Sequence, residues 1–133
     1  MTAKVQYLCE QCPALIHLKD IDGDTALHDM LKNVGRFNLE CVIILCIVDA
    51  TVVRDKFTPP DDTYLGSGEL PLHSLIRYRS EKMSQVSNEG DCFRLLLRLY
   101  PAAAGIKDDE SESPYDVAVY KNLSTYFIRL LLS

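Results

Sequence analysis

The chain has 133 residues, of which 47% are apolar and 25% charged, and its formal net charge is −5. This length predicts a single domain whose core is large enough to be stable without disulfides or a structural metal. The acidic balance argues against a nucleic-acid partner, because phosphate binding requires clustered Lys and Arg. No apolar run reaches the roughly 18 residues of a transmembrane helix, so no membrane span is expected.

The N-terminal residues 1–13 predict a leading apolar helix around Val5 to Cys12, and they contain no signal-peptide apolar region. The chain contains an odd number of cysteines, and all of them lie in apolar, helix-like segments. With no secretory signal visible, this favours reduced core thiols in an intracellular, reducing compartment, either cytoplasmic or organellar. The cysteines are Cys9, Cys12, Cys41, Cys46 and Cys92.

A turn and a short helix are predicted next, in the stretch DGDTALHDMLKN. Gly23 is expected to make the turn, which leads into a possible helix start. Leu27, Met30 and Leu31 have the spacing i, i+3, i+4, which places them on one buried helical face. A longer apolar helix is predicted to follow, from Leu39 to Ile47.

This arrangement of turn, short helix, loop and long helix recurs twice. GELPLH, which begins at Gly68, aligns with GDTALH, and ESPYDVAV provides a third copy. The apolar triplet recurs as well, and a long apolar helix is again predicted after each copy. The triplets are Leu72, Leu75 and Ile76, then Tyr115, Ala118 and Val119; the long helices are Cys92 to Tyr100 and Thr125 to Leu132.

Residues ahead of each copy also match. Pro-Ala and Lys-Asp pairs precede the first and third copies, at residues 13–14 and 19–20 and at residues 101–102 and 107–108. Arg54 and Asp55 are the predicted equivalent pair in the second. The expected units are 14–48, 49–100 and 101–133, with extra loop residues near 57–67 and 79–90.

These hexamers resemble the helix start of the ankyrin repeat family, G-x-T-P-L-H-x-A. The spacing between copies is about 45 residues, against about 33 in a typical ankyrin unit, and the loops hold the excess. The resemblance implies an all-α, ankyrin-like α-solenoid that acts as a non-enzymatic protein–protein interaction scaffold. Another solenoid of helix pairs, of the HEAT or tetratricopeptide type, remains an open alternative.

The resemblance also assigns structural roles to the motif. It implies that Thr25 caps the short helix and that His28 ties neighbouring units together. Leu70 stands where the second cap belongs, and Asp116 replaces the third histidine. Ser113 and Asp116 have the spacing of a capping box. The predicted motif residues are Gly23, Thr25 and His28, then Gly68, Pro71 and His73, then Ser113, Pro114 and Asp116.

Sites for metals are the first alternative reading of these residues. Asp20, Asp22 and Asp24 alternate like calcium ligands, but no glutamate stands at the twelfth position of either possible loop, so a solvated turn is favoured. Cys9 and Cys12 with His17 resemble part of a zinc site, but no second close pair of ligands follows. We therefore expect neither a metal nor a cofactor.

Catalysis is the second alternative. His28 and His73 stand at equivalent repeat positions, which favours structural hydrogen bonding over a catalytic pair. Cys92 stands near a predicted helix start, where a thiol pKa can fall, but no partner base is evident and a buried helical cysteine is favoured. If His28 is a structural tie, His28→Ala should cost on the order of 1–2 kcal/mol.

The expected partner is another protein, contacted through the acidic turns, the short helices and the insertions. Asp29 should point away from the core. Phe57 and Tyr64 either anchor a partner or fold back over the core. The candidate contact residues are Asp24, Asp29, Phe57, Tyr64, Asp109 and Glu110. Because both ends are apolar, the second hypothesis is a structural subunit or fragment of a larger complex, packed through those ends.

Overall fold

The computed structural model describes residues 16–33, 35, 37–60 and 67–132. Within these residues the regular secondary structure is helical throughout, which agrees with the predicted all-α class. The expected leading helix, Cys9, Cys12 and Tyr64 lie outside the described residues.

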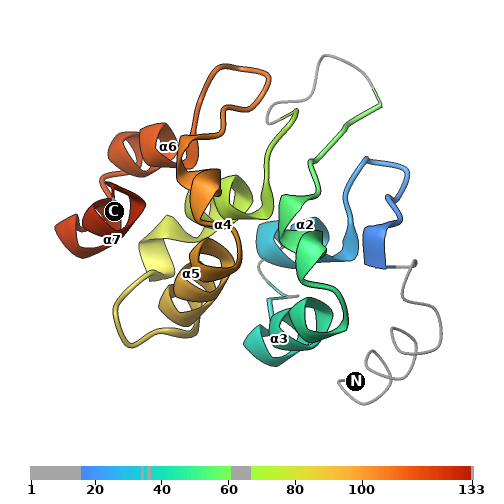
Figure 1. Ribbon diagram of the computed structural model, residues 1–133, viewed down its shortest axis with the longest axis horizontal. Helices are drawn as coiled ribbons and strands as arrows, with labels where there is room; N and C mark the ends of the chain where they lie inside the picture. Colours follow the sequence, from blue (N-terminus) through green and yellow to red (C-terminus); the bar gives the residue numbers. More distant parts are fainter. Residues whose placement is uncertain (1–15, 34, 36, 61–66, 133) are drawn as a thin grey trace.

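The helices come in consecutive pairs in which the first is shorter than the second, and we call them the short and the long helices (Figure 1). The short helices are α2 (Ala26–Lys32), α4 (Pro71–Arg79) and α6 (Pro114–Tyr120). The long helices are α3 (Leu39–Val48), α5 (Asn88–Leu99) and α7 (Thr125–Leu132). Short 3-10 helices follow α3, α4 and α5, in that order: η2 (Ala50–Arg54), η3 (Ser80–Lys82) and η4 (Pro101–Gly105).

The helices form two rows. In one row α2 packs on α4 and α4 on α6, and in the other α3 packs on α5. The second row continues through Phe93 of α5, whose ring meets Phe127 of α7 edge-on with centroids 5.0 Å apart. The core lies between the rows and includes fully buried leucines from both, such as Leu27, Leu75 and Leu96.

The apolar triplets of the first two short helices point into this core. Leu27, Leu31, Leu72, Leu75 and Ile76 are all buried, and Met30 is half-buried.

The third triplet is only partly buried, which corrects the prediction. Ala118 is buried, Tyr115 is half-buried and Val119 is 48% exposed. The equivalent residue Ile76 is fully buried on α4, which has α6 packed beside it, whereas no described helix packs beyond α6 in its row.

The loop predicted over residues 79–90 is shorter than expected. Arg79 belongs to α4, and α5 begins at Asn88 because the Ser87 hydroxyl caps it by accepting from the Gly90 amide at 3.0 Å. Gly90 is needed inside this helix, since a Cβ there would lie 1.9 Å from the Ser84 carbonyl oxygen.

Arg79 is itself a tie between units that the sequence pattern did not reveal. Its guanidinium is buried against the C-terminal end of α2, where Nε donates to the Leu31 carbonyl at 3.2 Å and Nη2 to the Asn33 carbonyl at 2.6 Å. Carbonyls at the last turn of a helix have no partner within the helix, so Arg79 supplies the hydrogen bonds that these two would otherwise lack. A cation at this end also complements the helix dipole.

Candidate functional site

The turns that precede the short helices lie along one edge of the molecule (Figure 1). In the first turn the Asp20 amide donates to the Asp24 carbonyl at 2.8 Å. The Asp20 carboxylate accepts from the amides two and four residues further on, at 2.9 and 3.0 Å. Asp108 makes the same bonds in the third turn, at 2.9 Å each. A side chain that replaces backbone partners in this way fixes the shape of the turn.

The second turn has a different register from the predicted one. The bond equivalent to that of Asp20 is made by Phe57, whose amide donates to the Glu69 carbonyl at 2.8 Å. Lys56 and Phe57, not Arg54 and Asp55, therefore correspond to the Lys-Asp pairs. Asp55 instead binds His17, with 2.6 Å between Oδ2 and Nδ1.

Neighbouring turns touch through their backbones. The Thr58 amide donates to the Gly23 carbonyl at 3.2 Å, and the Asp109 amide donates to the Ser67 carbonyl at 2.9 Å. The two motif glycines make this approach possible: Gly23 has a φ of 89° and Gly68 a φ of 81°. A Cβ on Gly23 would lie 2.0 Å from the Thr58 carbonyl oxygen.

His28 joins the first unit to the second. Its Nε2 donates to the Glu69 carbonyl at 2.9 Å, while its Nδ1 lies 2.9 Å from the Thr25 hydroxyl oxygen. Thr25 also caps α2 by accepting from the His28 amide. Both side chains are fully buried, and burial lowers the pKa of His28 to about 4, so the ring is neutral near pH 7.

His73 joins the second unit to the third in the same way. Its Nε2 donates to the Glu112 carbonyl at 2.8 Å, and its Nδ1 accepts from the Leu70 amide at 3.0 Å. The backbone amide of Leu70 thus takes the place of the threonine hydroxyl, and the leucine side chain is free to be buried in the core. Burial lowers the pKa of His73 as well.

The third unit forms only a local cap. The Ser113 hydroxyl accepts from the Asp116 amide, and the Asp116 carboxylate accepts from the Ser113 amide at 3.0 Å, as the spacing predicted. Asp116 is exposed, and the bonds of its side chain stay within its own turn. The tie therefore runs from the first unit to the second and from the second to the third.

A second set of ties consists of ion pairs. Lys32 and Arg77 stand at equivalent positions of α2 and α4, and each pairs with the acidic residue just before its own cap. Lys32 Nζ lies 2.7 Å from an Asp24 oxygen, and Arg77 Nε lies 2.5 Å from a Glu69 oxygen. Burial nevertheless raises the pKa of the Glu69 carboxyl above its ordinary value.

Both cations also reach the following unit. Lys32 Nζ lies 3.1 Å from the centroid of the Phe57 ring, and Arg77 Nη2 lies 3.3 Å from Glu112 and 3.7 Å from Asp108. Sequence reasoning missed this series. The sequence did contain a signal for this series. An acidic residue precedes each helix cap, and in the first two units a basic residue stands at the same position later in the short helix.

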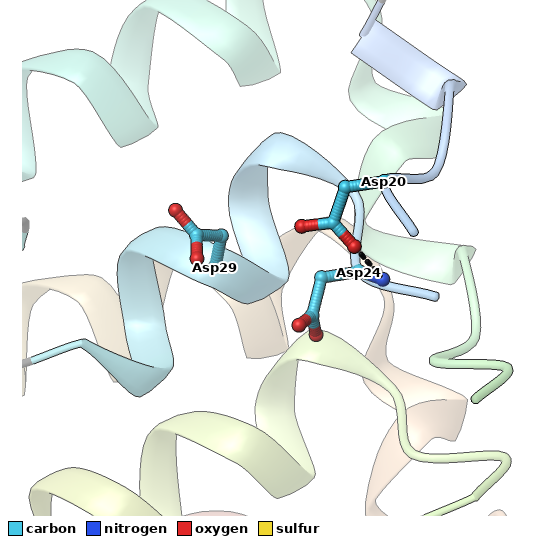
Figure 2. Close-up of side chains that lie close together, drawn as sticks. All are labelled: Asp20, Asp24 and Asp29. Atoms are coloured by element: carbon cyan, nitrogen blue, oxygen red, sulfur yellow. Dashed lines mark hydrogen bonds between the residues drawn. The ribbon is translucent and has the colours of Figure 1, made fainter. Parts of the chain in front are cut away.

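The acidic residues of the first turn include one group close enough to hold a cation. One carboxylate oxygen from each of Asp20, Asp24 and Asp29 lies within 4.8 Å of the others (Figure 2). The three carboxylates already have protein partners: backbone amides for Asp20, Lys32 for Asp24 and Asn33 for Asp29. The arrangement is that of a hydrogen-bonded turn, and the Asp22 carboxylate is not part of the group of three.

His17 lies between two carboxylates. Its Nε2 is 2.9 Å from Asp49, and its Nδ1 contacts Asp55. Both carboxylates raise the pKa of His17, and the hydrogen bond with Asp49 contributes most. The bonds with Thr51 and His17 lower the pKa of Asp49 to about 2. The cluster joins residues on either side of η2 to His17, and the Thr51 hydroxyl beside it donates to Asp49 at 2.7 Å rather than to the histidine.

The predicted contact residues fall into two groups. Asp109 and Glu110 are exposed, and Asp29 is half-buried, so they can meet a partner. Phe57 is only 3% exposed and covers the core, which corrects its reading as an anchor. The prediction that Asp24 contacts a partner is corrected as well, because its side chain is only 12% exposed and pairs with Lys32.

The hydroxyl–imidazole pair and the thiols considered above as catalytic candidates are buried in the described part of the chain. Thr25 and His28 form a hydroxyl–imidazole pair, but both are inaccessible to a substrate. Cys41, Cys46 and Cys92 are buried free thiols; burial raises the pKa of Cys46 to about 11 and that of Cys92 still further. Such thiols are poor nucleophiles near pH 7.

Comparison of the chain with protein-family models, curated proteins and solved structures gives no match. Among the residues described, no helix combines the length and apolar character needed to cross a lipid bilayer.

Proposed function

We propose that this chain is a non-enzymatic protein-binding module built as an ankyrin-like α-solenoid. The observation that carries the proposal is the repeated tie: His28 and His73 each bind a carbonyl of the next unit, at 2.9 and 2.8 Å. Equivalent bonds at equivalent positions are what a stack of similar units requires. They support the motif resemblance, with Leu70 and Asp116 as the departures from it.

The ties hold three turns and three short helices as one rigid platform. Rigid surfaces bind with less loss of conformational entropy than flexible ones, so a pre-ordered platform favours a recognition function. Its exposed side chains include aromatic residues, which are enriched where binding energy is concentrated. Tyr78 on α4 is 47% exposed and Tyr120 on α6 is 75% exposed. We define the short-helix face by these two tyrosines and Asp29.

Affinity capture from cell extracts tests the proposal. The bait is the full chain, compared with a Tyr78→Ala, Tyr120→Ala double variant. Val86→Ser is the control, because Val86 is 93% exposed and lies outside the short helices. We expect a defined set of proteins that the wild type and the control retain and the double variant loses.

Two outcomes contradict this proposal. Equal capture by all three baits excludes the short-helix face as the contact surface. Absence of any specifically retained protein, with circular dichroism showing that the baits are folded, argues against a protein-binding function altogether.

A structural subunit of a larger assembly is the second candidate. The observation that favours it is the apolar surface on the last helix pair, where Val119 is 48% exposed and Leu132 is 65% exposed. If this surface packs in an assembly, a Val119→Ser, Leu132→Ser variant should leave the large complex in gel filtration of cell extracts, whereas the tyrosine variant should stay in it.

A further inference from the structure

A groove lies between α5 and α7, and Pro101 of η4 contributes to its lining. Its volume is about 310 Å³, at the lower end of the roughly 300–1,000 Å³ typical of ligand pockets. Leu97, Leu130 and Pro101 form its apolar surface, and Arg94 and Arg98 stand among them. An apolar groove flanked by two guanidinium groups suits an apolar side chain with carboxylates on either side.

The two arginines differ in how their charge is used. Arg94 pairs with Asp91 and donates to the Tyr126 hydroxyl at 3.3 Å and the Gln85 carbonyl at 3.0 Å, so it is held in place. Arg98 is exposed, and no residue in the described part of the chain forms an ion pair with it. The groove thus keeps a positive charge at its rim, although the chain as a whole is acidic.

The first turn carries an exposed apolar side chain and the complementary charge. Ile21 is 90% exposed, which is unusual for a large apolar side chain, and Asp20 and Asp22 flank it. The hydrogen bonds that Asp20 accepts from the turn amides fix the backbone around Ile21. The isoleucine is therefore presented on a pre-formed turn and has little conformational entropy to lose on docking.

We propose that a second copy of this chain docks Ile21 of its first turn into the groove between α5 and α7. Ile21 packs against Leu97 and Leu130 there, and its flanking aspartates face Arg94 and Arg98. The turn leads into α2, on the far side of the molecule from α7 (Figure 1), so one molecule cannot fill its own groove. The contact is therefore head-to-tail, and it leaves one free turn and one free groove on every pair.

Such an interface is heterologous, and it extends into chains or closes into rings rather than stopping at a symmetric dimer. A single turn in a groove is a small interface, of the size seen in weak and transient complexes. We therefore expect self-association that grows with concentration. The inference goes beyond the proposed function, since it requires neither a foreign partner nor the short-helix face.

Sedimentation velocity of the purified full chain, up to about 1 mM, tests the proposal at the concentrations that weak interfaces require. Ile21→Ser removes the docking side chain and Arg98→Glu reverses the charge of the groove. Each should weaken self-association by about tenfold or more, because each changes the centre of a small interface. Both residues are exposed, so neither variant should unfold the chain, and Val86→Ser should behave as the wild type.

Mixing the two variants gives the decisive result. Ile21→Ser keeps an intact groove and Arg98→Glu keeps an intact turn, so an equimolar mixture should form a one-to-one dimer and no larger species. A wild-type chain that stays monomeric overturns the proposal, and it is the result expected if the groove binds an acidic segment of another protein. Self-association that neither variant weakens, or a mixture that stays monomeric, overturns it as well.

Discussion

The second and third units differ in the residue that stands three positions after the helix cap. In the second, His73 is buried and its ring donates to a carbonyl of the next turn at 2.8 Å. In the third, Asp116 is exposed and its carboxylate accepts from the amide of its own cap residue at 3.0 Å. Histidine can cap and donate at once, because its two ring nitrogens face opposite ways, whereas an ionised carboxylate only accepts. The residue at this position therefore decides whether the cap also provides a side-chain donor for the next turn.

The largest expected effect comes from removing a tie. His28→Ala leaves a cavity and removes the partners of a buried carbonyl and a buried hydroxyl, and we expect a loss of about 3 kcal/mol in unfolding free energy. This exceeds the 1–2 kcal/mol expected from the sequence, because the ring is fully buried. Asp116→Ala, the matched change in the third unit, should cost less than about 1 kcal/mol.

Urea unfolding of both variants measures the contrast. Equal losses for His28→Ala and Asp116→Ala would show that the tie contributes no more than a local cap does.

The next effect is a loss of stability on acidification. The folded-state pKa of His28 is about 4, below the ordinary value of 6.5, so the unfolded chain binds a proton more readily. The neutral ring therefore contributes its full stability above pH 6.5 and loses it as the pH falls toward 4. The loss from His28 is at most about 3 kcal/mol, and His73 acts in the same direction.

The carboxyls of Glu69 and Asp24 oppose this trend, because their raised pKa values mean that the folded chain takes up protons more readily at low pH. The informative measurement is therefore the difference between wild type and His28→Ala in urea unfolding from pH 7 to pH 4.5. We expect this difference to shrink as the pH falls. A constant difference, or a His28 ring that titrates near 6.5 by NMR, contradicts a buried neutral tie.

The smallest expected effect tests the contact between turns. Gly23→Ala forces a Cβ into a backbone with a φ of 89° and to within 2.0 Å of the Thr58 carbonyl oxygen. We expect a loss of about 2 kcal/mol, since strain at a positive φ adds to a steric clash. Gly105→Ala is the control, because a Cβ there has nothing within 4 Å. Thermal unfolding should separate the two variants, and equal midpoints would mean that the turns do not pack as closely as this.

Local features of this protein could be read from its sequence. The all-α class, the caps at Thr25 and Ser113, the turn glycines and the bounds of α7 depend on residues within a few positions of one another. The buried apolar faces of α2 and α4 depend on the same short spacings. Helix periodicity and capping are short-range properties, so a repeated hexamer was sufficient to indicate them.

Apart from the tie that the motif resemblance implied for His28, contacts between units were revealed only by the tertiary structure. Arg79 reaches carbonyls of α2, Phe57 is buried, and Lys32 and Arg77 each join an acid of their own unit to the next unit. Because the second turn is long, the residues equivalent to the Lys-Asp pairs are Lys56 and Phe57 and not, as predicted, Arg54 and Asp55. These contacts join residues far apart in sequence, and an insertion changes the distance along the chain without changing the distance in space. Local pattern therefore indicated most of the turns and helices, whereas packing between units decided which further side chains became ties and which, like Ile21, remained exposed.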